Sequence, residues 1–182
     1  ERIRGAQTDQ RVGARGVAEV PMAESKLPAI RPSVVALRGE MVGLRRELHE
    51  RPELGFKETE TAKKLAEALR PDFPKLRTGI AETGLSALLE PKGASRRAIL
   101  FRADMDALPV QEESNASYAS RNPGVMHACG HDCHMSVLLH AARHAAREPD
   151  AIAGAVRFIF QPAEEGPGGA EVMIREGILE EP

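Results

Sequence analysis

The 182-residue sequence predicts a layered α/β fold with a partly parallel sheet. Three observations lead to this fold class. Apolar residues recur every three or four positions over segments of helical length, short apolar runs of strand length lie between them, and Gly or Pro residues separate the two kinds of segment. With 42% hydrophobic and 29% charged residues, the composition is typical of a globular domain that buries a core.

Residues 1–32 mix Gly, Ala, Arg and Pro without apolar periodicity, so we expect them to form a flexible lead-in. The ordered domain is expected over residues 33–182. Its first helix shows the spacing of a face that packs on a core. The residues of this face are Val34, Leu37, Met41, Leu44 and Leu48. Pro52 ends the pattern, and a second helix is expected over residues 58–69.

Three strands should follow, over residues 76–81, 85–90 and 97–102. The last of these is apolar through its middle, and we expect it to be a buried strand. A long polar loop then leads to the second half of the domain. Its expected elements are a helix over residues 131–147, a strand over 155–160 and a helix over 170–176. Strands that alternate with helices indicate a sheet with parallel pairs.

Composition also limits the partners of this protein. The net charge of −2 predicts nothing about partners. No basic patch is interleaved with aromatic residues, and a single Tyr, no Trp and five Phe leave little material for stacking on bases, so we expect no nucleic-acid partner. No apolar run is long enough to span a bilayer, and no secretory signal is recognisable, so we expect no membrane partner. Cys129 and Cys133 give no disulfide framework, which favours a reducing compartment and hence the cytoplasm.

The most informative segment is MHACGHDCH at residues 126–134, which packs two cysteines and three histidines into nine residues before a helix. About thirty residues further on, the strand at 155–160 is followed by QPAEE, which contains Glu164 and Glu165. Thiolate, imidazole and carboxylate together are typical of a catalytic divalent metal site, whereas structural zinc sites use closed sets of four Cys and His. The two segments therefore predict metal-assisted hydrolysis.

A third polar cluster, Asp104 and Asp106, directly follows the strand at residues 97–102. Their spacing of two places both carboxylates on the same side of an extended backbone. Ligands of open α/β sheets bind at the carboxyl ends of the strands. We therefore expect all three clusters to meet at one edge of the sheet.

Each cluster also has a simpler interpretation. Cys129 and Cys133 could be a buried free pair or, in an oxidising setting, a disulfide. The two glutamates could cap the next helix, and the two aspartates could form a turn before Pro109. His134 is a candidate for supporting a metal ligand. For His140 and His144, at i and i+4 of one helix, we expect a solvated face, and for His49 a structural role.

Four stretches carry a family resemblance. They are RRELHERPELGFKETETA at 45–62, RADMDALP at 102–109, NPGVMHACGHDCHMSVLLHAA at 122–142 and VRFIFQPAEEGPGGAEVMIREG at 156–177. Together they closely resemble the amidohydrolase branch of the aminoacylase and carboxypeptidase-G type zinc metallopeptidases, which includes hippurate hydrolase and hydrolases of auxin amino-acid conjugates. The resemblance implies an α/β/α metallopeptidase catalytic domain.

The resemblance also implies roles for particular residues. By their place in the motifs, Cys129, His131 and Glu165 would bind a pair of divalent metals, and Glu164 would be the general base. Asp106 would orient a metal-binding side chain. Zinc is the default for these ligands, and manganese, cobalt or nickel are alternatives.

The implied activity is metal-dependent hydrolysis of amide bonds in N-acyl amino acids, with a small-molecule amide as substrate. Family members extend past the position of Pro182 with two further metal-binding histidines and a smaller domain that supports a homodimer. We therefore expect this chain to be the N-terminal part of a catalytic domain and inactive by itself. One alternative is a noncatalytic metal-binding or interaction module derived from half of such an enzyme. A weaker alternative is a Cys129 nucleophile with His131, since the loop is crowded with competing ligands.

Overall fold

The computed structural model describes residues 29–93, 95–166 and 168–180. Residues from Arg31 onward form one compact unit. The expected lead-in of residues 1–32 lies almost wholly outside the described residues, and the division into a lead-in and a domain stays a prediction. In the described residues, no helix is both long enough and apolar enough to cross a membrane.

Helices and strands occur in the predicted order. The helices are α1 (Pro32–Ala36), α2 (Arg38–Glu50), α3 (Thr59–Leu69), α4 (His131–Arg147) and α5 (Gly169–Arg175), with a 3₁₀ turn η1 (Pro149–Ala151). The strands are β1 (Arg77–Ile80), β2 (Gly84–Leu89), β3 (Ser95–Asp104) and β4 (Gly154–Gln161). The predicted α/β fold class is thereby confirmed.

The first helix differs from its prediction. The apolar pattern indicates one continuous helix, but the structure divides it at Leu37 into α1 and α2. The N–H of Leu37 bonds to the carbonyl of Val34, three residues back, at 3.1 Å. Such a bond tightens the backbone for one turn and interrupts the α-helical ladder.

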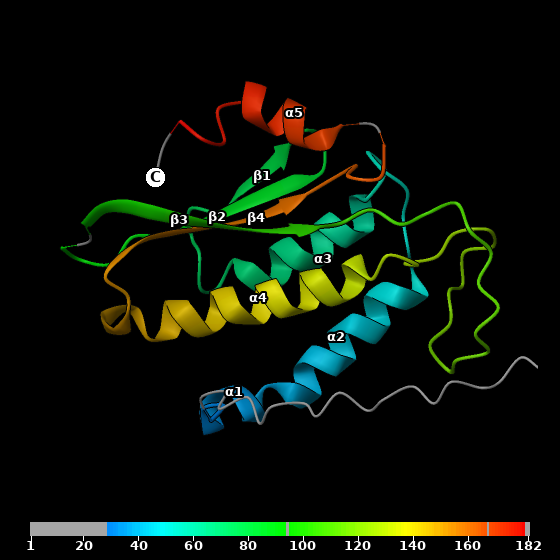
Figure 1. The fold of residues 1–182 in the computed structure, drawn as a ribbon, viewed down its shortest axis with the longest axis horizontal. Helices are drawn as coiled ribbons and strands as arrows, with labels where there is room; N and C mark the ends of the chain where they lie inside the picture. Colours follow the sequence, from blue (N-terminus) through cyan, green and yellow to red (C-terminus); the bar gives the residue numbers. More distant parts are fainter. Residues whose placement is uncertain (1–28, 94, 167, 181–182) are drawn as a thin grey trace, which may run out of the picture. The chain divides into compact units, whose positions relative to one another are not determined.

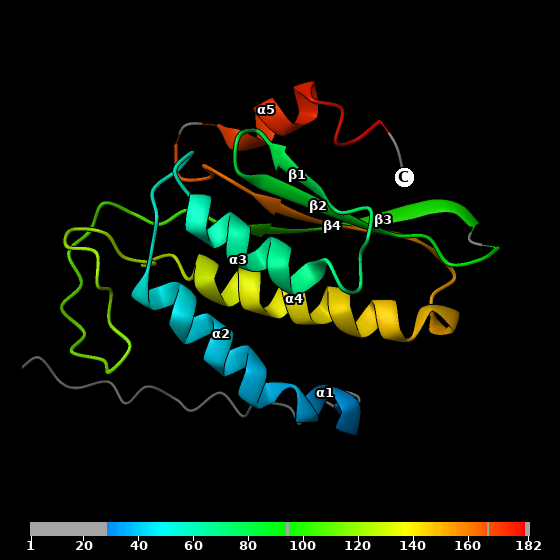
Figure 2. The ribbon, with the colours of Figure 1, turned by 180° about the vertical axis from the view of Figure 1, so that it is seen from behind.

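The sheet has the order β1-β2-β4-β3, with β3 parallel to β4 and the other neighbours antiparallel (Figure 1). Strand β4 has a neighbour on each edge, and residues on both of its faces are buried. Phe158 and Phe160 belong to a large core that includes residues of α3 and α4, and Ile159 belongs to a smaller core that includes Met173 of α5. Helices α3 and α4 therefore cover one face and α5 the other (Figure 2), which gives the expected α/β/α layers.

The prediction that residues 97–102 form a buried strand is wrong. Strand β3 lies at the edge of the sheet, and no strand of the described residues pairs with its outer side. Ile99 is 58% exposed and Phe101 48%, although the Phe101 ring stacks on Phe158 at 6.0 Å between centroids. An apolar run is typical of a strand buried on both faces, but the run itself does not specify how many neighbours the strand has.

The parallel pairing of β3 and β4 positions the candidate site. Asp104, the last residue of β3, lies opposite Gln161, the last residue of β4. The N–H of Met105 then bonds to the carbonyl of Gln161 at 2.9 Å and continues the contact by one residue. The segments that leave the two strands therefore start side by side.

Candidate metal centre

The site begins at the amino end of α4. Gly130 has a φ of +84°, a left-handed conformation that glycine adopts at low cost, and His131 is the first helical residue. This turn leaves Cys129 exposed and buries His131, which is 5% exposed. Within the predicted segment at 126–134, Cys129 and Cys133 are both exposed and His127 and His131 are both buried, and of these Cys129 and His131 lie at the candidate site.

His131 is oriented by the loop that follows β3. Its Nδ1 lies 2.8 Å from the backbone carbonyl of Asp106. A carbonyl can only accept, so Nδ1 donates and Nε2 is left to bind a metal or a proton. Nε2 faces the two acids of the QPAEE segment, 3.9 Å from an oxygen of Glu164 and 3.8 Å from an oxygen of Glu165.

Asp106 is 2% exposed and links the same two segments. One carboxylate oxygen accepts the backbone N–H of Glu165 at 2.9 Å, and the other lies 3.5 Å from His131 Nδ1. Burial raises the pKa of Asp106, but the interactions with His131 and with the N–H of Glu165 more than offset it, so the pKa lies below its usual value. The contact closest to His131 comes from the backbone carbonyl of Asp106, whereas its carboxylate holds Glu165.

Cys129, His131 and Glu165 lie within metal-binding reach of one another, since one donor atom from each falls within 4.8 Å of the other two. In the part of the chain that the structure describes, Glu165 Oε1 is buried and accepts no hydrogen bond. A buried carboxylate oxygen without a donor costs free energy that a cation would recover. The donor set of sulfur, nitrogen and oxygen therefore fits a divalent ion such as zinc.

The metal-free site holds protons where a metal would bind. Asp106 raises the pKa of His131 to about 9 despite the opposing effect of burial. The nearby Glu165 carboxylate, together with burial and the charges of Glu164 and Asp106, raises the pKa of Cys129. A dication would displace both protons, because metals bind thiolate and neutral imidazole.

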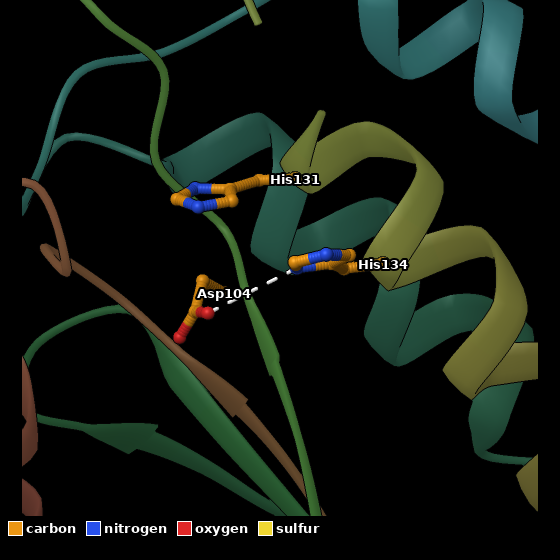
Figure 3. Close-up of side chains that lie close together, drawn as sticks. All are labelled: Asp104, His131 and His134. Carbon is orange, nitrogen blue, oxygen red and sulfur yellow. Dashed lines mark ion pairs between the residues drawn. The ribbon is translucent and has the colours of Figure 1, made fainter. Parts of the chain in front are cut away.

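A second group of possible ligands consists of Asp104, His131 and His134 (Figure 3). His134 is exposed, and its Nδ1 lies 3.9 Å from the Asp104 carboxylate. The other oxygen of that carboxylate is 3.0 Å from Nε of Arg102, which already supplies a positive charge. Because His131 offers a single free nitrogen, it can serve one of the two groups at a time. The group with Cys129 contains no competing cation and is the better candidate.

Three of the simpler interpretations are wrong. Cys129 and Cys133 are not a buried pair, because both are exposed. Glu164 and Glu165 do not cap the next helix, because α5 begins after Gly168 and no side chain caps it. His140 does not lie on a solvated face: it is 4% exposed, and its Nδ1 lies 2.8 Å from the carbonyl of Ser136. Helix α2 packs on this side of α4, where Ser136 donates a hydrogen bond to the carbonyl of Met41.

Sequence reasoning missed a buried network next to the site. Asp132 is fully buried, and its Oδ2 lies 2.7 Å from His49 Nδ1 and 2.8 Å from Arg45 Nε. The other nitrogen of His49 lies 3.2 Å from Glu112 in the long loop. Asp132 is also an acid in the first turn of a helix, so its sequence position is equally typical of a simple favourable interaction with the helix dipole.

Comparison with known proteins identifies the family. Residues 100–182 match the model of peptidase family M20/M25/M40. The chain is 46% identical over 149 residues to hippurate hydrolase of Campylobacter jejuni, an alignment that covers 82% of this chain and 38% of that protein. This chain belongs to peptidase family M20/M25/M40. It is also 43% identical over 153 residues to an N-acyl-L-amino acid amidohydrolase of Geobacillus stearothermophilus, covering 83% of this chain and 41% of that protein.

Solved structures of similar proteins superpose on this M20/M25/M40 chain. A Bacillus subtilis protein described as a dinuclear metal-binding peptidase of the M20 family superposes with a TM-score of 0.75 and 38% identity, over 81% of this chain and 41% of that one. A Staphylococcus aureus protein described as an aminohydrolase gives a TM-score of 0.77 and 41% identity, over 82% and 40% of the two chains. The predicted resemblance is confirmed, and the chain spans about 40% of the length of these relatives.

Proposed function

We propose that this chain is the part of an M20/M25/M40 enzyme that supplies metal ligands and the general base for hydrolysis of amide bonds in N-acyl amino acids. The observation that carries the proposal is the convergence of Cys129, His131 and Glu165 on one point, with the Glu164 carboxylate on the same side of His131. The amidohydrolase names of the similar proteins support an N-acyl amino acid as the substrate.

In this proposal Cys129, His131 and Glu165 hold a divalent ion, with zinc as the default and manganese, cobalt or nickel as alternatives. The ion would polarise the amide carbonyl and lower the pKa of a water molecule. We expect two ions in the complete site and propose that polypeptide outside this chain supplies the remaining ligands. A homodimer of the full-length protein likewise stays a proposal.

Glu164 is assigned as the general base. Its side chain is 37% exposed, so both water and substrate can reach it. The carboxylate would take a proton from the attacking water and deliver it to the leaving amine. Asp106 would assist by fixing His131 through its carbonyl and Glu165 through its carboxylate.

The electrostatics disfavour Cys129 as a nucleophile. An activated thiol has a lowered pKa, usually beside a cation or a helix amino terminus. Here the Glu165 carboxylate raises the pKa of the Cys129 thiol. Such a thiol is protonated at neutral pH until a metal ion binds, which favours its role as a ligand.

The first test is the stoichiometry and affinity of zinc binding to the purified 182-residue chain, measured for the wild type, Cys129→Ala and Glu165→Ala. A matched control is Glu171→Gln, since Glu171 is an exposed acid that pairs with Arg175 on α5. We expect stoichiometric binding by the wild type and the control and loss of binding in both site variants. A folded wild-type chain without zinc affinity would contradict the metal site and favour the noncatalytic interaction module.

The activity needs a second test, because we expect the chain to be inactive alone. The part of this chain that aligns with the Campylobacter hippurate hydrolase, 149 residues at 46% identity, can replace the matching segment of that enzyme. The chimera should hydrolyse an N-acyl amino acid, and Glu164→Gln in the chimera should abolish turnover while zinc stays bound. A chimera that binds zinc and in which Glu164→Gln retains full activity would remove Glu164 from the mechanism.

A further inference from the structure

Glu58 is a completely buried acid that lies just before α3 and outside the ligand set. Both of its oxygens accept hydrogen bonds. Oε1 accepts the backbone N–H of Ala163 at 2.9 Å, and Oε2 accepts the hydroxyl of Thr83 at 2.7 Å. Burial raises the pKa of Glu58, and these bonds act in the opposite direction. A buried carboxylate is retained at a cost, so its contacts indicate what it does.

Its partner Ala163 adopts an uncommon conformation. Ala163 has a φ of +53° and is fully buried. A side chain with a Cβ is strained in this left-handed region, so surrounding contacts must hold it there. The carbonyl of Ala163 accepts the N–H of Gly169 at 3.1 Å, while Glu58 accepts its N–H. Both backbone groups of the residue before Glu164 are therefore fixed.

We propose that Glu58 is a positioning residue that holds the turn at residues 161–166 in the shape that aims Glu164 and Glu165 at His131. The proposal rests on the function proposed above for these two acids. Asp106 holds the same turn from the other side by accepting the N–H of Glu165 at 2.9 Å. Two buried carboxylates thus bind the backbone N–H groups on either side of Glu164, and the Glu164 side chain itself stays free to react.

The two hydrogen bonds of Glu58 depend on the length of its side chain. Glu58 joins three segments that are distant in sequence, namely the start of α3, the β1–β2 connection at Thr83 and the site turn at Ala163. A shorter acid keeps the negative charge but cannot span Thr83 and Ala163 together. A glutamine keeps the length, can accept from Ala163 and can donate to the Thr83 hydroxyl, which is able to act as an acceptor. Charge and reach can therefore be separated by substitution.

The experiment compares Glu58→Gln with Glu58→Asp in the 182-residue chain, by zinc affinity and by hydrogen exchange of the backbone amides at 161–166. Glu53→Ala is the matched control. The carboxylate of Glu53 also serves the start of α3, by accepting the N–H groups of Glu60 and Thr61, and within the described residues it makes no hydrogen bond with the turn at residues 161–166. Glu53→Ala therefore reports on loss of α3 stability by itself.

We expect Glu58→Asp to weaken zinc binding about 10- to 100-fold and to speed exchange of the Ala163 amide about tenfold or more. Glu58→Gln should stay within about threefold of the wild type in both measurements, and so should Glu53→Ala in zinc affinity. Normal behaviour of Glu58→Asp, or equal losses in Glu58→Gln or Glu53→Ala, would overturn the proposal. If the wild type binds no zinc, the proposed function fails, and the exchange rates still decide whether Glu58 holds the turn.

Discussion

His131 and Asp132 are neighbours in the first turn of α4, yet they belong to two different side-chain clusters. The clusters differ in whether their carboxylate oxygens are paired. Around Asp132 each acidic oxygen has a partner: Oδ2 pairs with His49 and Arg45, and Oδ1 accepts the N–H of Cys133 at 2.9 Å. Around His131 two acids face a single nitrogen at 3.8 and 3.9 Å without hydrogen-bonding it. Both clusters combine a histidine with acidic residues, but the carboxylate oxygens of Asp132 are paired, whereas Glu165 Oε1 accepts no hydrogen bond within the described residues.

This difference distinguishes residues that stabilise the fold from residues that bind a metal. A buried network whose charges are paired stabilises the arrangement of the segments it joins, here α2, α4 and the loop that carries Glu112. A group of donors with an unsatisfied buried oxygen is held apart by its scaffold and gains free energy when a cation arrives. Substitutions in the first cluster should therefore change folding, and substitutions in the second should change metal binding.

The largest expected effect is that of Asp132→Ala on the free energy of unfolding. Removal of Asp132 leaves His49 and Arg45 without their shared acid, and breaking a buried charge pair from one side costs about 3–5 kcal/mol. Urea unfolding measures the loss. The control Asp150→Ala, at an exposed position, should stay within about 0.5 kcal/mol of the wild type. Equal stability of the two variants would mean that the Asp132 network is not structural.

Next in size is the effect of Glu165→Gln on zinc affinity, which should fall by at least about 100-fold. Its metal-free stability should change by no more than about 0.5 kcal/mol, because Glu165 Oε1 accepts no hydrogen bond within the described residues. Titration calorimetry and urea unfolding of the same samples separate the two quantities. Zinc at about 100 times its Kd should stabilise the wild type by about 2.7 kcal/mol and leave the variant unchanged. A large loss of metal-free stability would show that Glu165 is structural.

A third prediction concerns pH. The pKa of His131 is raised to about 9 in the folded protein, above its ordinary value of 6.5. Its proton therefore stabilises the metal-free fold fully below about pH 6.5, and this contribution is lost as pH rises through about 9. Zinc affinity should change in the opposite direction, rising about tenfold per pH unit between pH 6.5 and 8 for this proton. The raised pKa of Cys129 should make the slope steeper.

Zinc titrations at several pH values measure this slope, with unfolding of the metal-free chain at the same values. Asp106→Asn should flatten both dependences, because Asp106 is the main cause of the raised pKa of His131. An affinity that does not vary with pH would mean that His131 is not a ligand.

The smallest expected effect is that of His134→Ala, which should change zinc affinity by less than about threefold. His134 is exposed, and the carboxylate it faces is already paired with Arg102. Zinc titration of His134→Ala beside Cys129→Ala decides between the two groups that share His131. A loss as large as that of Cys129→Ala would instead favour the group with Asp104.

Much of the fold could be predicted from the sequence, because helices α3 and α4 and strands β2 and β4 follow from local apolar patterns bounded by Gly and Pro. The predictions were wrong where a segment distant in sequence determines whether a residue is buried or exposed. The apolar run of β3 predicted a buried strand, but its environment depends on which strands pair with it. The i, i+4 histidines of α4 predicted a solvated face, but α2 covers His140.

The sequence by itself determined the kinds of donor at the candidate site and the elements that carry them, because ligand chemistry and helix or strand periodicity are local properties. Only the tertiary structure decided which donors meet. The parallel pairing of β3 and β4 placed the Asp106 and Glu165 segments side by side, and the contact of His131 with the Asp106 carbonyl brought the start of α4 to them. The tertiary structure also gave Asp132 and Glu58 their partners. The sequence does not show whether a buried acid binds a metal, an imidazole or a backbone N–H. That partner is determined by the segments that pack against the acid in the folded protein.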